Sequence, residues 1–341
     1  MTPTTQRVPR FAGDRRIEAW VRPVPAPDVG ELLIRVRANA LCGTDRSQYL
    51  HGSDVVPGHE AAGTVAEVGP GTTTPVGTPG VVFLMDFCGA CRSCRLALTN
   101  QCLAKRADMG FTRDGGYGAY ELVSESNFFP IGADLPFADA TLLLDVMGTT
   151  GHALDRASLV RPDVGSVVVA GAGPLGAGIV AMARIVLGPD VPVVVGDLVA
   201  ERLVLVEDLG GRPVDLGAST LAEGVRSHGL PEGADVAIDT AGRGAARVGL
   251  LEALGKRGVL VCVGHGEELT LDVSRDLIAP ERAVVGSEYF RYDELPGNLE
   301  RLRANRDLLG RILTRRYPIE ELPAALEAFF AGAPGKVVVE Q

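Results

Sequence analysis

The chain has 341 residues, a length that favours two domains over one ordinary core. Its formal net charge of -10 at pH 7 argues against nucleic acid or an anionic membrane surface as the main partner. No apolar run reaches the roughly 18 residues of a membrane span, and residues 1–10 lack the apolar core of a signal peptide. We therefore expect a cytoplasmic protein whose partner is a small molecule.

The first part of the chain, to about residue 150, shows the pattern of short strands and turns. Apolar residues alternate with arginines over 34–38, which is the period of a strand with one buried face. Residues 61–68 form another strand before a Gly-Pro-Gly turn, and the glycine-rich turn 114–118 precedes a further one. We predict a mostly β region over residues 1–150.

A candidate metal site lies within this β region. His59 and Glu60 are adjacent, Cys42 lies 17 residues upstream, and Asp145 lies downstream. Zinc accepts sulfur, imidazole and carboxylate donors, and one of each leaves a fourth position open. The pattern predicts a catalytic zinc site rather than a closed structural one.

Four of the six cysteines lie within 15 residues, at Cys88, Cys91, Cys94 and Cys102. In a reducing cytoplasm, thiols at this spacing favour metal binding over disulfides or redox chemistry. Four thiolates saturate tetrahedral zinc, so we predict a structural zinc site. Cys262 lies in an apolar run and is interpreted as a buried core thiol.

From about residue 160 the pattern changes to strands that alternate with helices. The apolar run 166–170 leads into a Gly-x-Gly-x-x-Gly turn, and residues 177–186 form an Ala-rich helix. A second strand ends at Asp197, 21 residues after Gly176, and more strands follow at 235–239, 258–264 and 283–286. This context predicts a doubly wound parallel sheet over 151–287 that binds a dinucleotide at Gly171, Gly173, Pro174, Leu175 and Gly176.

Asp197 also bears on the choice of cofactor. A carboxylate at this strand end hydrogen-bonds the 2′-hydroxyl of NAD and repels the 2′-phosphate of NADP, so we predict NAD. Arg202 either softens this preference or lies on a solvated helix face.

These motifs together resemble those of the zinc-dependent medium-chain alcohol and polyol dehydrogenases, the sorbitol dehydrogenases among them. The resemblance covers nearly the whole chain and includes Cys-Gly-Thr-Asp over 42–45 and Gly-His-Glu over 58–60. It implies an α/β protein with a GroES-like catalytic domain over 1–150, a Rossmann domain over 151–287 and a segment 288–341 that returns to the catalytic domain. It also implies a homodimer or homotetramer with NAD and two zinc ions per chain.

The resemblance assigns roles to the residues of the metal site. Cys42, His59 and Asp145 would bind the catalytic zinc in the cleft between the domains, and Glu60 would be a fourth ligand that comes and goes. In this family, zinc makes a bound alcohol more acidic and the nicotinamide accepts its hydride.

Three residues that follow Cys42 in the chain, Thr44, Asp45 and Ser47, would support these metal ligands. Asp45 would accept a hydrogen bond from His59, and Thr44 would carry the proton from the substrate. Many relatives have histidine where this chain has Ser47, so the outer end of the proton relay is open. His51 is either a substitute or a surface residue.

The resemblance also points to the C-terminal half of the chain. The backbone around Val263 and Gly264 would lie beside the nicotinamide, and His152 would be a packing residue rather than a ligand.

Residues 290–292 read Phe-Arg-Tyr, and a Phe-Arg-Tyr lines the substrate site of sorbitol dehydrogenases. We therefore expect Arg291 and Tyr292 to contact the substrate, and the alternative is an exposed turn. Arg291 could also pair with Glu60 or Asp145.

The leading hypothesis is an NAD-dependent dehydrogenase of a secondary alcohol in a polyol, cyclitol, aminocyclitol or sugar. The alternatives are a dehydrogenase of simple secondary alcohols that uses NAD or NADP, and a zinc-free quinone or enone reductase. A zinc-ribbon module that binds nucleic acid or protein would leave most of the chain unexplained.

Overall fold

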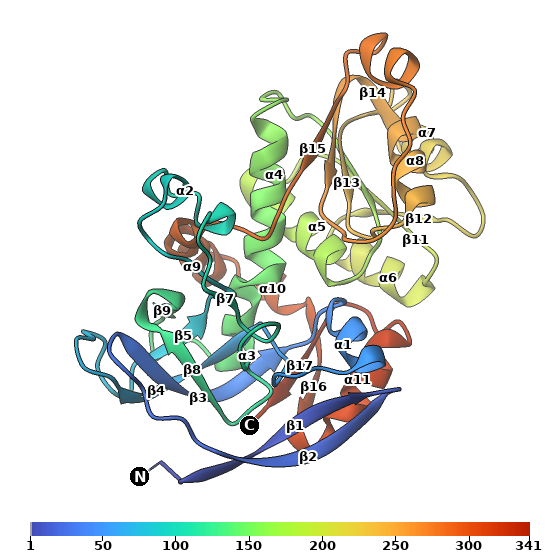
Figure 1. Cartoon of the computed structure of the whole chain (residues 1–341). Helices are drawn as coiled ribbons and strands as arrows, with labels where there is room; N and C mark the ends of the chain where they lie inside the picture. Colours follow the sequence, from blue (N-terminus) through green and yellow to red (C-terminus); the bar gives the residue numbers. More distant parts are fainter. Residues whose placement is uncertain (1) are drawn as a thin grey trace.

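The computed structural model describes residues 2–341, which form two parts, each built on a β-sheet (Figure 1). The lower part in Figure 1 holds a seven-stranded sheet with the path β16-β17-β3-β4-β5-β9, and β8 pairs with β3. Its strands are β3 (Glu31–Ala40), β4 (Ala61–Val68), β5 (Pro79–Val82), β8 (Tyr120–Ser124), β9 (Phe128–Pro130), β16 (Leu313–Pro318) and β17 (Lys336–Glu340).

Two small antiparallel pairs accompany this sheet. They are β1 (Thr5–Gly13) with β2 (Arg16–Pro23), and β6 (Met85–Asp86) with β7 (Ala107–Asp108). Four helices belong to this part: α1 (Asp45–His51), α2 (Arg92–Arg95), α3 (Phe137–Ala140) and α11 (Leu322–Phe330). The last two strands of the chain, β16 and β17, therefore complete a sheet that begins with β3.

The second part is a six-stranded parallel sheet in the order β12-β11-β10-β13-β14-β15. Its strands are β10 (Val167–Ala170), β11 (Val193–Asp197), β12 (Arg212–Asp215), β13 (Ala234–Asp239), β14 (Leu254–Cys262) and β15 (Ala283–Gly286). The order reverses between β10 and β13, and such a switch point is where open α/β sheets bind ligands. The predicted α/β fold, a GroES-like β part with a Rossmann sheet, is confirmed.

Side chains of the central strands alternate between two apolar layers, which is why the strands read as continuous apolar runs. Val167 and Val169 pack on the side of α5 (Pro174–Val186) and α6 (Ala200–Asp208), whereas Val168 packs on the side of α7 (Leu221–Ser227) and α8 (Gly244–Ala253). The sheet is therefore covered on both faces.

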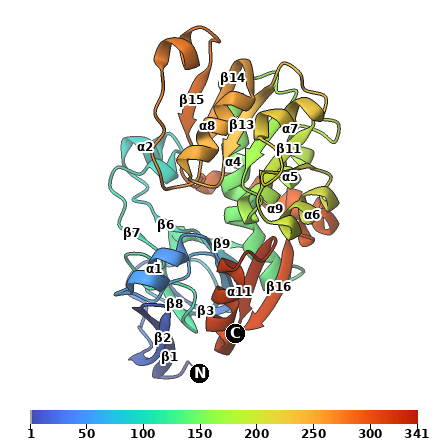
Figure 2. The same ribbon diagram turned by 90° about the vertical axis from the view of Figure 1, so that its right-hand side faces the viewer.

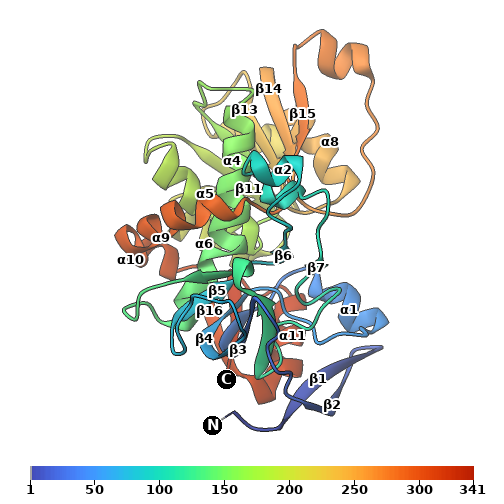
Figure 3. The ribbon, with the colours of Figure 1, turned by 60° about the vertical axis from the view of Figure 1, so that its left-hand side comes forward.

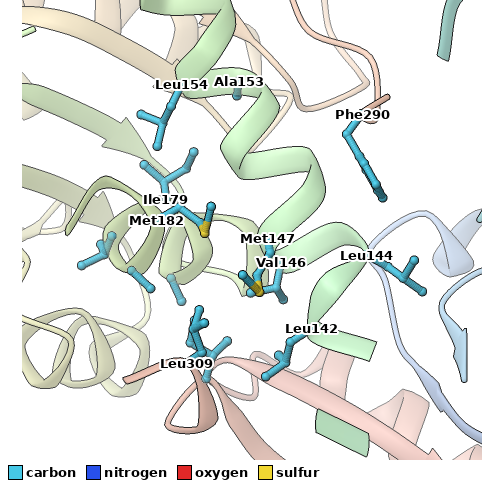
Figure 4. Close-up of a cluster of buried hydrophobic side chains, with 14 of the residues drawn as sticks. Leu142, Leu144, Val146, Met147, Ala153, Leu154, Ile179, Met182, Phe290 and Leu309 are labelled. Atoms are coloured by element: carbon cyan, nitrogen blue, oxygen red, sulfur yellow. The ribbon is translucent and has the colours of Figure 1, made fainter. Parts of the chain in front are cut away.

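A π-helical turn, Asp145–Thr149, continues into α4 (Thr150–Ser158) and joins the two parts. Figure 4 shows side chains of segment 142–147 gathered with those of α5 and with Leu309, which belongs to α10 (Arg306–Gly310). The helix α9 (Leu295–Ala304) lies beside them (Figures 2 and 3). One apolar core extends from the β part into the Rossmann part. Within residues 2–341 no helix is long and apolar enough to cross a membrane.

Glu121 on β8 is an exception to the apolar interior. Both of its carboxylate oxygens are buried without a hydrogen-bond partner among the described residues. Burial raises the pKa of Glu121 well above its ordinary value, although Arg113 acts against this shift. The folded protein therefore holds a proton that the unfolded chain releases.

The sign of the resulting pH dependence follows from linkage. The contribution of Glu121 to stability is complete below its unfolded-state pKa and is lost as the pH rises toward the folded-state pKa, by up to about 1.4 kcal/mol per pH unit. We predict that Glu121→Gln removes this loss. The free energy of unfolding of the variant should therefore rise relative to that of the wild type as the pH increases from about 5 to 8. Chemical denaturation at each pH measures this difference.

Glu125 gives a matched control for this measurement. Hydrogen bonds from Thr73 and Thr74 outweigh the effect of burial and lower the pKa of Glu125. The difference between Glu125→Gln and wild type should therefore be flat over the same range. A flat difference for Glu121→Gln as well would show that Glu121 is ionised in the folded protein.

Candidate active site

The predicted catalytic metal ligands come together where three segments of the β part meet. Cys42 follows β3, His59 and Glu60 precede β4, and Asp145 begins the π-helical turn. One donor atom of each residue lies within 4.8 Å of all the others. The Nε2 atom of His59 is 3.6 Å from Oδ2 of Asp145.

These separations suit zinc. Ligand atoms about 2.0–2.3 Å from a tetrahedral zinc stand about 3.3–3.8 Å apart, which matches the distance between His59 and Asp145. The mixture of sulfur, imidazole and carboxylate donors is also one that zinc accepts. The buried imidazole nitrogen Nδ1 of His59 has no hydrogen-bond partner among the described residues, and it faces Oδ1 of Asp45 at 3.7 Å. The residues present therefore fit the metal.

Two hydrogen bonds hold the carboxylate of Asp45 in place. Its Oδ2 atom accepts from the amide of Cys42 at 3.0 Å and from the hydroxyl of Tyr117 at 2.6 Å. Asp45 thus stands beside the ring of His59, and its predicted role in orienting that ring stays a prediction. Thr44 and Ser47, at and after the start of α1, are exposed, and so is His51 at its end.

Glu60 forms a fully buried ion pair with Lys336, which the sequence analysis did not single out. Burial, together with the charge of Asp145, raises the pKa of Glu60 to about 8, and Lys336 acts in the opposite direction. Although burial acts to lower it, the charges of Glu60 and Asp145 raise the pKa of Lys336. The sequence signal that could have pointed to this buried ion pair is a lysine, Lys336, at the start of the otherwise apolar run Lys336–Val339.

The four cysteines that are predicted to bind a structural zinc form a separate group on a lobe around α2. The sulfur atoms of Cys88 and Cys94 are 3.9 Å apart, as are those of Cys91 and Cys102. Backbone amides of Cys94 and Leu103 donate to Cys91 and lower the pKa of its thiol to about 6. Four sulfur atoms at tetrahedral spacing fit a closed zinc site.

The glycine turn after β10 has the geometry that a pyrophosphate needs. Gly171 has φ of 98°, which favours glycine, and a Cβ on Gly176 would lie 2.0 Å from the carbonyl oxygen of Gly171. Space is open where a side chain on Gly173 would stand. Pro174 and Leu175 begin α5, whose N-terminus favours an anion.

Asp197 at the end of β11 is tied to this turn. Its carboxylate accepts from the amides of Ala172 at 2.6 Å, Leu198 at 2.7 Å and Val199 at 2.9 Å. Arg202 is 3.8 Å from it and has only 22% of its side chain exposed. Arg202 is therefore near the predicted ribose position, and the alternative of a solvated helix face does not hold.

Val263 and Gly264 follow β14, and their amides donate to the carbonyl oxygen of Asp239 at 3.0 and 2.9 Å. Both residues line a cavity of about 1010 Å³ at the carboxyl end of the parallel sheet. Arg291 and His152 line the same cavity, whereas the predicted catalytic zinc ligands do not.

Arg291 and Tyr292 have hydrogen-bond partners within the protein, and their contact with a substrate stays a prediction. The Nε atom of Arg291 donates to Glu294 at 2.8 Å, so the expected pairing with Glu60 or Asp145 is wrong. The nearby carboxylate three residues along the chain takes the guanidinium instead. The Tyr292 hydroxyl is likewise occupied, because it donates to the carbonyl oxygen of Phe128 at 2.6 Å.

His152 belongs to this same network and not to the metal group, as its packing role predicts. Its Nδ1 atom is 2.8 Å from Glu294, and its Nε2 atom is 3.4 Å from the amide nitrogen of Asn100.

Comparisons with known proteins agree with this fold. Residues 28–133 match the alcohol dehydrogenase GroES-like domain, and residues 164–304 match the zinc-binding dehydrogenases. The chain is 30% identical to an L-threonine 3-dehydrogenase of Rhizobium rhizogenes, with 94% of each protein covered.

Solved structures show the same fold. A putative zinc-binding dehydrogenase from Sinorhizobium meliloti 1021 bound to NADP is 25% identical, with a TM-score of 0.86 over 99% of this chain and 100% of that one. An Escherichia coli CFT073 protein termed a short chain alcohol dehydrogenase, complexed with NADH, is 21% identical, with a TM-score of 0.88 over 99% and 100%.

The ion pair of Lys336 yields a test that does not depend on activity. Lys336→Met leaves Glu60 buried without its partner, and at about pH 9, above the raised pKa of Glu60, we predict a loss of about 3–5 kcal/mol in the free energy of unfolding of the metal-free protein. The double variant Glu60→Gln with Lys336→Met should lose less, because no lone charge remains. Denaturant titration measures both, and equal losses would contradict the pairing.

Proposed function

This chain belongs to the zinc-dependent medium-chain dehydrogenase family, and we propose that it transfers a hydride between NAD and a secondary alcohol of a polyol, cyclitol, aminocyclitol or sugar. The observation that carries this proposal is the donor group Cys42, His59 and Asp145, beside which Glu60 pairs one carboxylate oxygen with Lys336 and keeps the other without a partner among the described residues. Three donors with an open position are the arrangement of a catalytic zinc site.

Zinc held by these residues would supply a Lewis acid that makes a substrate hydroxyl more acidic. Asp45 orients His59, and the exposed hydroxyl of Thr44, two residues after Cys42, would take the proton outward. Ser47 lies one helical turn further along α1 and would pass this proton to solvent.

The dinucleotide would lie along the carboxyl ends of β10, β11 and β14. Its pyrophosphate would lie against the amides of residues 171–176, its adenosine ribose near Asp197, and its nicotinamide, which accepts the hydride, near Val263 and Gly264. Asp197 favours NAD over NADP because a carboxylate repels a 2′-phosphate. The nearby Arg202 is the residue that would limit this preference.

A second candidate function is the oxidation of a simple secondary alcohol. The ring of Phe111 lies 5.0 Å from that of His59, so part of the surroundings is apolar. Arg291, the expected donor for additional hydroxyls, is engaged elsewhere. The donor group itself opposes a zinc-free quinone or enone reductase.

A substrate screen with metal analysis tests the proposal. The protein should contain about two zinc ions per chain and should produce NADH with at least one polyol, inositol, aminocyclitol or aldose. Simple secondary alcohols and L-threonine belong in the same screen. Activity restricted to simple alcohols would favour the second candidate, and activity in zinc-free protein would overturn both.

Asp197 allows a test of cofactor choice. Asp197→Ser removes the repulsion of a 2′-phosphate and a hydrogen bond to the ribose, and a hydrogen bond to a charged group is worth about 1.5–3 kcal/mol. We predict that the ratio of kcat/KM for NAD to that for NADP falls by about tenfold or more. An unchanged ratio would show that Asp197 serves the glycine turn alone.

Arg202→Ala is the matched control for this measurement. It should weaken the use of NADP by the Asp197→Ser protein, because the guanidinium is the cation nearest the new phosphate position.

A further inference from the structure

The π-helical turn Asp145–Thr149 presents one of the metal-ligand candidates, Asp145, to the others. Every residue of the turn is buried. The residue before it, Leu144, has φ of -81° and ψ of -111°, a conformation that belongs neither to a helix nor to a strand. π-Helical turns are rare and occur frequently at functional sites. The neighbours that hold this turn therefore bear on the metal site.

The first neighbour of the turn is the ring of Phe290, which lies against Gly148. A Cβ atom on Gly148 would stand 2.4 Å from two ring carbons of Phe290, so only a glycine leaves room for the ring. Phe290 is fully buried. Its ring is perpendicular to that of Phe83 at 5.2 Å, and it is 4.3 Å from the ring of Tyr289. Aromatic neighbours thus keep the Phe290 ring against the turn.

The second neighbour of the turn is the helix α5. A Cβ atom on Gly178, in α5, would stand 2.6 Å from the carbonyl oxygen of Val146. Val146 and Gly148 are two positions apart, and such residues point in different directions from a helical turn. Figure 4 shows Phe290 on one side of this helical segment and Met182 of α5 on the other. The turn is thus enclosed between the Phe290 ring and α5.

The carboxylate of Asp145 follows the backbone of this turn. Its Oδ1 atom accepts a hydrogen bond from the hydroxyl of Thr149, within the same turn, at 3.3 Å. Its Oδ2 atom is 3.6 Å from Nε2 of His59. An α-helical turn closes one residue earlier than a π-helical turn, so it would aim the carboxylate in another direction. The contacts that hold the π-helical form therefore also hold Asp145 at the metal group.

We propose that Phe290 is a positioning residue for the catalytic metal site. Its ring, seated on Gly148, holds the π-helical turn in the form that directs Asp145 toward the other metal-ligand candidates. In this role Phe290 acts through the turn and does not bind the metal. The inference rests on the zinc site of the proposed function and adds a residue to it.

Two substitutions at this contact test the proposal. In Phe290→Ala the ring is absent and the turn is free to relax, whereas in Gly148→Ala a new methyl group collides with the ring and displaces the turn. Each should weaken metal binding at the catalytic site by about ten- to a hundredfold, as substitutions that disturb a ligand's support do. In the double variant the methyl group has room, so the loss should be far smaller than the product of the single losses.

Cobalt(II) titration of the metal-free protein provides the readout. A site with one thiolate and a site with four thiolates differ in their visible absorption when cobalt(II) is bound, so the two affinities are followed separately. Affinity at the four-cysteine lobe should be unchanged in every variant, which also shows that the variant is folded. If Phe290→Ala does not fold, Phe290→Leu replaces it, with a smaller loss expected in the same direction.

Phe329→Ala is the matched control for the loss of a buried ring. Phe329 lies on α11 in a different apolar cluster from Phe290. Its substitution should lower the Tm, because it leaves a cavity. It should leave cobalt(II) affinity at the catalytic site as in wild type.

The outcomes separate this inference from the proposed function. Catalytic-site affinity in Phe290→Ala equal to that in Phe329→Ala would overturn the role of Phe290 alone, as would single losses that multiply in the double variant. A loss of the same size at the four-cysteine lobe would show a general structural effect and would also overturn it. Wild-type protein that binds cobalt(II) at the four-cysteine lobe only would overturn the proposed function, and this inference with it.

Discussion

The buried ion pair between Lys336 and Glu60 is the contact on which the site depends. Lys336 begins the last strand, and Glu60 follows the histidine of the metal group, so the pair joins segments 276 residues apart. Neither charge could stay in this interior alone, because an unpaired buried charge is costly. The pair therefore connects β17, which is already paired with β3, to the metal group through one carboxylate oxygen of Glu60. The last strand of the chain, which returns to the first sheet, thus contributes Lys336 to the site.

The second requirement is a fixed relation between the metal group and the dinucleotide site. Asp145 begins the helical segment that continues through α4, and the core around it packs directly against α5, which begins at the glycine turn. Figures 1 and 3 show α4 between the two sheets. Since a packed core resists deformation, the two sites are held at a defined separation. Hydride transfer between an alcohol and a nicotinamide needs this geometry.

The sequence predicted those features that depend on local patterns. The spacing of the four cysteines, the Gly-His-Glu motif and the strand, glycine turn and helix near 166–186 each define a geometry within a short segment. The fold class followed from them. The bounds of the domains and the roles of individual site residues remain predictions that rest on the resemblance and on the distances described above.

What failed or was missed depended on the partners that charged side chains find in the folded protein. Arg291 was offered as a partner of Glu60 or Asp145, but its Nε atom bonds Glu294, three residues along the chain, whereas its contact with the substrate stays a prediction. Lys336 and Glu121 are polar residues in apolar strands. Such violations of a local pattern are signals in the sequence, yet their partners, or the lack of them, become visible only in the structure.

The most direct test of this account is a crystal structure of the zinc- and NAD-loaded protein, with zinc located by anomalous diffraction. The account predicts a zinc ion bound by Cys42, His59 and Asp145, with Glu60 still paired to Lys336, and a second zinc ion on the four-cysteine lobe. A zinc ion with Glu60 as its fixed fourth ligand, and Lys336 free of it, would contradict the account.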